Sequence, residues 1–212
     1  MTLACGIDLG LRPKTALAFV RYEQGKFVAD GEIQKGLTDE AIERLIESRR
    51  PDIVAIDAPL SARMEEIRPA EKELRVMLKD YSDVFYVAGT IGSPFGLLLF
   101  PITYRGMYLR DRLQGITELV ETHPLIDFLF LDGDPANAEV LRCRKSNNAI
   151  QYEILRRYVQ ELPDDLDDDE LDAVMCAFIA CVRASGESDF QITELSKLYD
   201  TDPAFIIFSL TS

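Results

Sequence analysis

The sequence predicts an α/β fold in which a central mixed sheet is flanked by helices. Its first third follows the order strand, strand, strand, helix, strand, and the strand candidates are residues 3–8, 15–22, 26–34 and 52–57. The last candidate is a short apolar run of the kind that is buried on both faces in a parallel sheet. Because 212 residues suffice for one domain with a sizeable core, we expect a single domain over residues 1–212.

The elements of this first third follow from local signals. Gln24 and Gly25 predict a hairpin turn between the second and third strands. Thr38 predicts the N-cap of a helix, because the apolar residues after it recur at helical spacing. Pro51 then separates this helix from the fourth strand.

The rest of the chain predicts four further helices, a strand and a basic stretch that precedes one of these helices. Glycines and prolines over residues 82–101 predict an irregular loop, and residues 132–137 are rich in turn formers. An apolar tail at residues 205–210 is expected to pair or dock. The regular elements expected here are helices over residues 69–79, 102–113, 146–162 and 169–184, and a fifth strand over residues 116–121.

Composition excludes several classes of function. The four cysteines form no C-x-x-C pair and His123 is the single histidine, which argues against a zinc site and a disulfide framework. No apolar run reaches the roughly 20 residues that span a bilayer, and the first residues lack a signal-peptide pattern. We therefore expect that the protein does not associate with a membrane and that its location is cytoplasmic. The net charge of −14 argues against broad attraction to nucleic acid but leaves a local basic groove open.

Two aspartates end neighbouring strands of the predicted sheet. Asp8 closes the first strand before Gly10, which permits a sharp turn, and Asp57 closes the fourth. A right-handed crossover places the fourth strand parallel to the first, so both carboxylates are expected at one edge of the sheet, where ligands of open α/β sheets bind. Either aspartate alone is equally well explained as a turn residue that bonds its own backbone.

Other acids are candidates for the same site. Asp169 and Asp172 are one helical turn apart, and Asp172 precedes an apolar stripe that continues through Cys176. A buried acid of this kind is usually paired or bound to metal, whereas Asp169 is also explained as a first-turn acid that favours the helix dipole. Glu121 ends the fifth strand, where an ordinary edge position is the alternative.

Together these motifs resemble a family. The sequence is similar to an uncharacterised family of predicted ribonuclease H-like nucleases, nearest to the Holliday-junction resolvase branch of that superfamily. The resemblance covers roughly residues 5–185 in consistent order. It rests on Gly6-Ile7-Asp8, Ile56-Asp57-Ala58-Pro59-Leu60-Ser61, Arg68 with Glu71 and Glu73, Arg105-Gly106, Glu121-Thr122-His123-Pro124, Lys145-Ser146 and Leu171-Asp172-Ala173.

The resemblance implies a ribonuclease H-like fold, with five strands in the order 3-2-1-4-5, and a metal-dependent nuclease. Such an enzyme hydrolyses phosphodiester bonds with two Mg²⁺ or Mn²⁺ ions about 4 Å apart. It implies that Asp8 bridges both ions and that Asp57 and Asp172 each complete the shell of one ion. Glu121 or Asp169 is then auxiliary, acting through a water.

A nuclease also needs cations that bind the phosphates of its nucleic-acid substrate. The sequence leaves open the type of nucleic acid and whether the protein forms a homo-oligomer. The residues selected are Arg105, Arg144 and Lys145, and the last two belong to a basic cluster just before a predicted helix. They come from a wider set of candidates: Arg63, Arg68, Arg105, Arg110, Arg142, Arg144 and Lys145. Solvated surface charge explains that cluster equally well.

Two other functions fit the same motifs. A nucleotide-binding ATPase or kinase of the sugar-kinase and actin class also opens with G-I-D-L-G, although 212 residues are short for the two domains that such proteins usually need. A non-catalytic binding module on the same fold is the third alternative, and the acidic composition favours it slightly.

Overall fold

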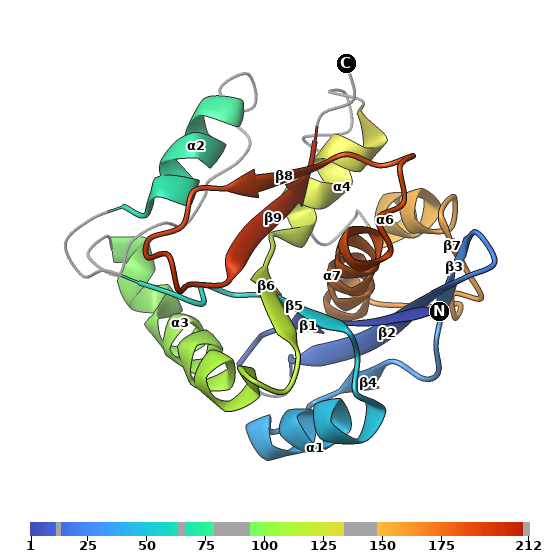
Figure 1. Ribbon diagram of the computed structural model, residues 1–212, viewed down its shortest axis with the longest axis horizontal. Coiled ribbons are helices and arrows are strands. Elements are labelled where there is room, and N and C mark those ends of the chain that lie inside the picture. Colours follow the sequence, from blue (N-terminus) through green and yellow to red (C-terminus); the bar gives the residue numbers. More distant parts are fainter. Residues whose placement is uncertain (12–13, 63–66, 79–93, 134–147, 210–212) are drawn as a thin grey trace.

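The computed structural model describes residues 1–11, 14–62, 67–78, 94–133 and 148–209. It confirms the predicted class, α/β with a mixed sheet flanked by helices (Figure 1). The described strands are β1 (Thr2–Asp8), β2 (Ala16–Glu23), β3 (Lys26–Ala29), β4 (Gln34–Lys35), β5 (Ile53–Asp57), β6 (Glu118–Glu121), β7 (Val159–Gln160), β8 (Ile192–Leu195) and β9 (Ala204–Phe208). The described helices are α1 (Asp39–Arg49), α2 (Pro69–Met77), α3 (Pro94–Leu113), α4 (Pro124–Asp132), α6 (Asn148–Leu155) and α7 (Asp168–Ser185).

The five predicted strands occur in the predicted order, as β3-β2-β1-β5-β6. β1, β2 and β3 are antiparallel neighbours, whereas β1, β5 and β6 are parallel. Gln24 and Gly25 form the predicted turn, and both have positive φ, as the tight turns that suit twisted hairpins require. Thr38 caps α1 as predicted, because its side chain accepts a hydrogen bond from the Ala41 N–H.

The sheet is wider than the five strands predicted. β7 extends it beyond β3, β9 and β8 extend it beyond β6, and β4 pairs with β2. The single third strand predicted at residues 26–34 is wrong, because the chain turns at Gly31, with φ of 89°, between β3 and β4. The apolar tail does pair, since β9 lies between β6 and β8.

Two helix boundaries also differ from the prediction. α3 begins at Pro94, inside the stretch predicted to be irregular, and proline is favoured at the first helical position. The helix predicted to end at residue 162 ends at Leu155, and the chain then joins the sheet as β7. Residues 82–93 and most of the turn-rich loop lie outside the described residues. None of the described helices is long and apolar enough to cross a membrane.

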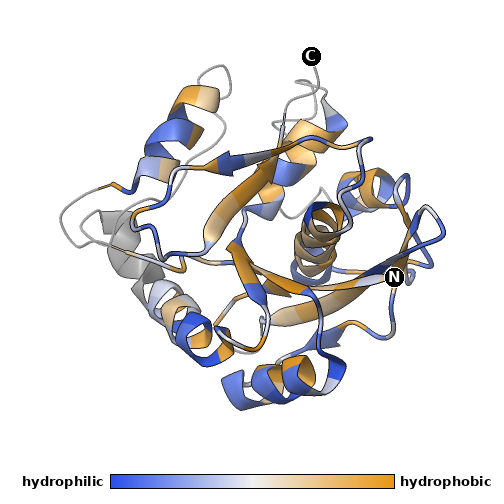
Figure 2. Ribbon diagram, in the orientation of Figure 1, coloured by the Kyte–Doolittle hydropathy of each residue, from blue (hydrophilic) through white to orange (hydrophobic). Residues whose placement is uncertain are grey.

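Buried apolar residues form two core layers, one on each face of the sheet. Helices lie on both faces of the sheet (Figure 1), and the strands are coloured mostly as hydrophobic (Figure 2). Cys5, Ile7 and Ile56 face the layer that contains α1 and α3. The alternate strand residues face α7, which has α4 and α6 beside it and is buried along almost its whole length. A helix that is buried on several sides can carry a charged residue only where that residue finds a partner, which makes Asp172 conspicuous.

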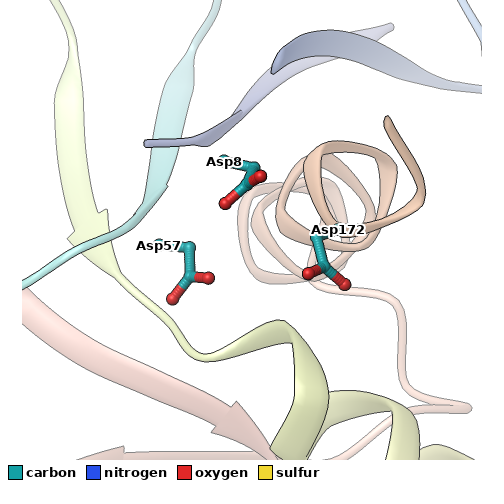
Figure 3. A group of neighbouring side chains, drawn as sticks. All are labelled: Asp8, Asp57 and Asp172. Atoms are coloured by element: carbon teal, nitrogen blue, oxygen red, sulfur yellow. The ribbon is translucent and has the colours of Figure 1, made fainter. Parts of the chain in front are cut away.

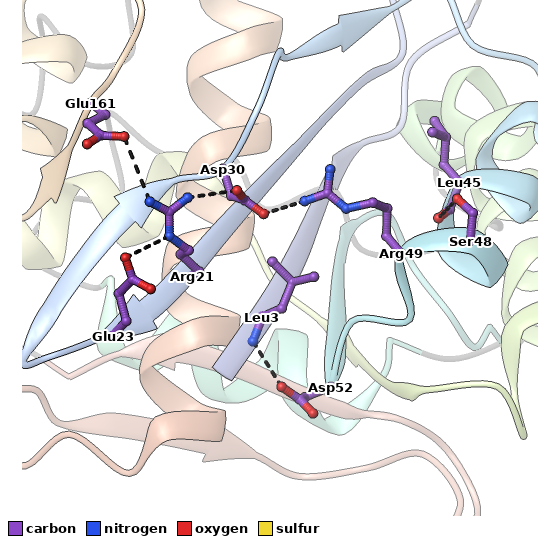
Figure 4. A network of polar contacts seen from close by, with 9 residues as sticks. All are labelled: Leu3, Arg21, Glu23, Asp30, Leu45, Ser48, Arg49, Asp52 and Glu161. Carbon is purple, nitrogen blue, oxygen red and sulfur yellow. Dashed lines mark hydrogen bonds and ion pairs between the residues drawn. The ribbon is translucent and has the colours of Figure 1, made fainter. Parts of the chain in front are cut away.

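Polar contacts attach α1 to β2 and to the residue after β3 (Figure 4). Asp30 accepts a hydrogen bond from Arg21 at 2.7 Å and also pairs with Arg49 at the end of α1. The Arg49 guanidinium lies 4.5 Å from the centre of the Phe19 ring. These contacts, with the Leu3 N–H that donates to Asp52 at 2.9 Å, fix the start of β5 beside β1.

Candidate metal site at the carboxyl ends of β1 and β5

The carboxyl ends of β1 and β5 place two aspartates side by side. The two strands are parallel neighbours, and their register pairs Asp8 with Asp57 at the last residue of each. Residues paired in this way project to the same face. The preceding residues, Ile7 and Ile56, face the opposite core layer, so both aspartates face α7.

The beginning of α7 supplies a third aspartate. The Asp167 side chain accepts a hydrogen bond from the Glu170 N–H, and Glu170 accepts one from the Asp167 N–H. This capping box fixes where the helix starts and therefore where Asp172 lies. Asp172 is buried and Asp8 and Asp57 are half-buried, and a carboxylate oxygen from each lies within 4.8 Å of those of the other two (Figure 3).

Gly6 allows α7 to approach β1 closely enough to form this cluster. A β-carbon at position 6 would lie 2.1 Å from the Ala173 carbonyl oxygen and 2.1 Å from the Ala177 nitrogen. Both atoms belong to the backbone of α7, which cannot move aside as a flexible side chain could. The glycine therefore sets the distance between the strand that carries Asp8 and the helix that carries Asp172.

Replacing Gly6 by alanine is expected to lower the free energy of unfolding by about 3 kcal/mol, the upper end of ordinary overpacking. Urea unfolding measures the change. Gly25→Ala is the matched control, because a β-carbon there meets nothing within 4 Å and only the positive φ of 77° costs energy, about 1 kcal/mol. Equal losses in the two variants would contradict a steric role for Gly6.

The electrostatics and chemistry of the cluster suit a divalent cation. Burial raises the pKa of the Cys176 thiol well above its ordinary value, and the charges of Asp57, Asp8 and Asp172 raise it further. The site thus has a strongly negative potential, and gathering like charges is unfavourable without a counter-charge. Carboxylate oxygens are the ligands that Mg²⁺ and Mn²⁺ prefer, so these three residues fit such an ion.

Asp169, which the sequence also suggests as a metal ligand, belongs to a different group of acids. Its carboxylate clusters with those of Asp167 and Asp168. Lys35 from β4 pairs with Asp167 and lies 3.2 Å from Asp169. The described structure therefore gives Asp169 a lysine partner at the start of α7, one turn before Asp172.

Glu121 lies at the end of β6, as predicted, and forms a buried ion pair with Arg68. Its two oxygens accept hydrogen bonds from the Arg68 guanidinium at 2.6 and 2.7 Å, and one of them also accepts from the Leu60 N–H at 2.9 Å. Arg68 donates further to Glu71 and to the Ser61 carbonyl. Burial alone would lower the pKa of Arg68, but Glu121 and Glu71 raise it above its ordinary value, so the arginine stays charged.

These contacts explain the most specific motif of the sequence, residues 56–61. Asp57 enters the cluster, Ala58 and Leu60 are buried, and Glu121 and Arg68 hold the backbone of Leu60 and Ser61. Gly106 of α3 packs so closely that a β-carbon there would lie 2.7 Å from the Pro59 carbonyl oxygen. The motif thus fixes the chain immediately after Asp57.

The predicted cations are only partly described. Arg105 donates to Asp39 at 2.5 Å and to the backbone carbonyls of Gly10 and Leu37, which joins α3 to the loop after β1 and to the start of α1. It therefore holds together the surroundings of Asp8. Arg144 and Lys145 lie outside the described residues.

Two polar residues near the site were not predicted from the sequence. Gln151 of α6 donates a hydrogen bond from Nε2 to Asp172 Oδ1 at 3.2 Å. Asp127 of α4 is fully buried and contacts Thr122, the residue after Glu121. A signal existed for both, since Gln151 shares a helix face with Ile154 and Leu155, and Asp127 interrupts an apolar run.

No protein-family model and no curated protein matches the chain. Among solved structures, the chain is similar to one titled "Thermus thermophilus RuvC structure". The two are 15% identical, the match covers 87% of this chain and 97% of that chain, and the TM-score is 0.47.

Proposed function

We propose that this chain is a metal-dependent nuclease that hydrolyses phosphodiester bonds. One observation carries the proposal, the meeting of Asp8, Asp57 and Asp172 from two adjacent strands and a buried helix. A fold that only needed stability would place apolar side chains there, because three close carboxylates are costly without a cation. The resemblance to ribonuclease H-like nucleases in the order of their motifs supports the same reaction.

Asp8, Asp57 and Asp172 would hold Mg²⁺ or Mn²⁺. When bound, such ions stabilise negative charge on the phosphoryl oxygens and lower the pKa of an attacking water. The protein itself keeps the three carboxylates in position, through the Asp167–Glu170 capping box and the close approach at Gly6. Glu121 acts on this site through Arg68 and the backbone of Leu60, as a positioning residue.

The substrate is a nucleic acid, whose phosphates need local cations because the chain has a net charge of −14. Arg105 and Arg110 already donate hydrogen bonds to protein groups. Arg105 donates to Asp39, and Arg110 donates to the Leu60 carbonyl at 2.7 Å and to Asp111. Arg144 and Lys145 therefore remain the proposed phosphate contacts.

Millimolar Mn²⁺ is expected to raise the melting temperature of the wild-type protein, since a ligand at 100 times its dissociation constant stabilises by about 2.7 kcal/mol. The increment should vanish in Asp8→Asn, which removes a central ligand. It should persist in Asp169→Asn, the control, because Asp169 lies with Lys35 in the neighbouring cluster. Differential scanning calorimetry with and without Mn²⁺ measures both.

Cleavage of single-stranded, double-stranded, hybrid and branched nucleic acids, with Mn²⁺ and with Mg²⁺, tests the reaction itself. Nuclease activity that persists in the Asp8→Asn variant would contradict the proposal. Metal binding without cleavage of any of these substrates would favour the non-catalytic binding module instead.

A further inference from the structure

One buried polar atom beside the acidic cluster has no hydrogen-bond partner in the described structure. The Gln151 side chain is 2% exposed, and its Nε2 donates to Asp172, but its Oε1 is buried and unpaired. Leaving a buried carbonyl oxygen unpaired costs about 1–3 kcal/mol. A buried oxygen of this kind calls for a donor that the described residues do not supply, such as a water or a hydrated ion.

The Asp172 carboxylate determines which end of the Gln151 amide has no hydrogen-bond partner among the described residues. A carboxylate only accepts hydrogen bonds, so the amide must present its N–H₂ to Asp172 and leave Oε1 on the other side. The unpaired oxygen therefore belongs to an amide group that is already in contact with the cluster. It can accept a hydrogen bond but cannot donate one.

The donor that Gln151 lacks must come from outside the cluster. Asp8, Asp57 and Asp172 have no proton to offer when they are ionised, whereas a water bound to a divalent cation is a strong donor. We propose that Gln151 is a positioning residue of the metal site: its Nε2 orients Asp172, and its Oε1 accepts a hydrogen bond from a water on the cation. This inference rests on the proposed function, because it needs a cation held by the three aspartates.

Gln151→Met is the decisive variant, because methionine has a similar length but offers neither the donor nor the acceptor. The dissociation constant for Mn²⁺, measured by electron paramagnetic resonance of free Mn²⁺, is expected to rise about tenfold to a hundredfold, as when other residues that orient metal ligands are lost. The melting temperature of the metal-free protein should change little, because the loss of the hydrogen bond to Asp172 and the loss of the unpaired buried oxygen act in opposite directions.

Ile154→Val is the matched control on the same helix face of α6. It should cost about 1 kcal/mol of stability and leave Mn²⁺ affinity unchanged. If Gln151→Met loses stability as the control does and binds Mn²⁺ as the wild type does, the inference is overturned while the proposed function stands. If the wild type itself binds no Mn²⁺, the proposed function fails, and the inference with it.

A measurement on the wild-type protein covers the case in which Gln151→Met does not fold. The side-chain amide signals of Gln151 in nitrogen–proton correlation spectra should shift during titration with diamagnetic Mg²⁺. The exposed Gln160 of β7 provides the reference signal, which should stay in place. An unmoved Gln151 signal at saturating Mg²⁺ would overturn the inference.

Discussion

Replacing Glu121 by glutamine is expected to lower the free energy of unfolding by about 4 kcal/mol, the cost of breaking a buried ion pair by removing one partner. The carboxylate is only 6% exposed and accepts three hydrogen bonds, two from Arg68 and one from Leu60. Glutamine keeps one acceptor and turns an N–H₂ toward groups that are themselves donors. Urea unfolding at neutral pH measures the loss.

The variant Glu153→Gln gives the matched comparison. Glu153 pairs with Arg156 on the surface, where both side chains are more than half exposed, and such a pair is worth less than about 1 kcal/mol. The same chemical change should therefore be nearly silent there.

Metal binding decides between two roles for Glu121. If Glu121 positions the chain after Asp57 through Arg68, Glu121→Gln should mainly lower the free energy of unfolding. The affinity for Mn²⁺ should then change only modestly. Normal stability together with lost Mn²⁺ binding would instead make Glu121 a direct ligand, rather than the auxiliary catalytic residue, acting through a water, that the resemblance implies. The side chain's observed partners favour the positioning role.

The central strands could be predicted because each carries its own signal. β1 and β5 are short apolar runs that end in an acid, and the β2–β3 hairpin has its turn residues at Gln24 and Gly25. The outer strands could not be predicted in this way. β4 and β7 are two residues long, and what makes them strands is pairing with distant partners, Lys35 with Ala16 and Val159 with Phe27.

The same distinction applies to the site. Asp8, Asp57 and Asp172 could be named because a strand end or an apolar helix face fixes where each side chain points. The partner of Glu121 could not be named, because Arg68 lies 53 residues earlier in the sequence and its approach depends on how α2 begins. Position along an element is a local property, whereas the choice of an ionic partner is a tertiary one.

Asp127 carries the other large effect, because its complete burial favours the protonated, neutral carboxyl. The Thr122 hydroxyl lies 2.8 Å from the Ile206 carbonyl oxygen and 2.6 Å from Asp127 Oδ2, yet it has only one hydrogen. As a donor, the hydroxyl would have to share this hydrogen between the two acceptors. A neutral Asp127 removes the competition, because its own proton can go to the Thr122 oxygen while the hydroxyl donates to the carbonyl. Burial raises the pKa of Asp127 to about 8. The hydrogen bonds from Thr122 and Phe208 oppose this rise, and the charge of Asp57 adds to it.

Asp127→Asn is therefore expected to flatten the dependence of stability on pH. The folded protein keeps a proton that the unfolded chain releases above its ordinary pKa of 3.8, so the contribution of Asp127 is fully present below that pH and is lost as the pH rises to about 8. Across this window the wild type should lose up to about 1.4 kcal/mol per pH unit relative to the variant. Urea unfolding between pH 4.5 and 8.5 measures the difference.

Asparagine can replace the neutral acid bond for bond. Its N–H₂ donates to the Thr122 hydroxyl, and its oxygen accepts from the Phe208 N–H, which donates to Asp127 at 2.9 Å. Asp127→Leu removes both contacts and should destabilise at every pH, because the Phe208 N–H is left buried without its acceptor and the Thr122 hydroxyl keeps only the Ile206 carbonyl. Parallel pH profiles for the wild type and Asp127→Asn would contradict this prediction. They would show that Asp127 has an ordinary pKa and is ionised in the folded protein.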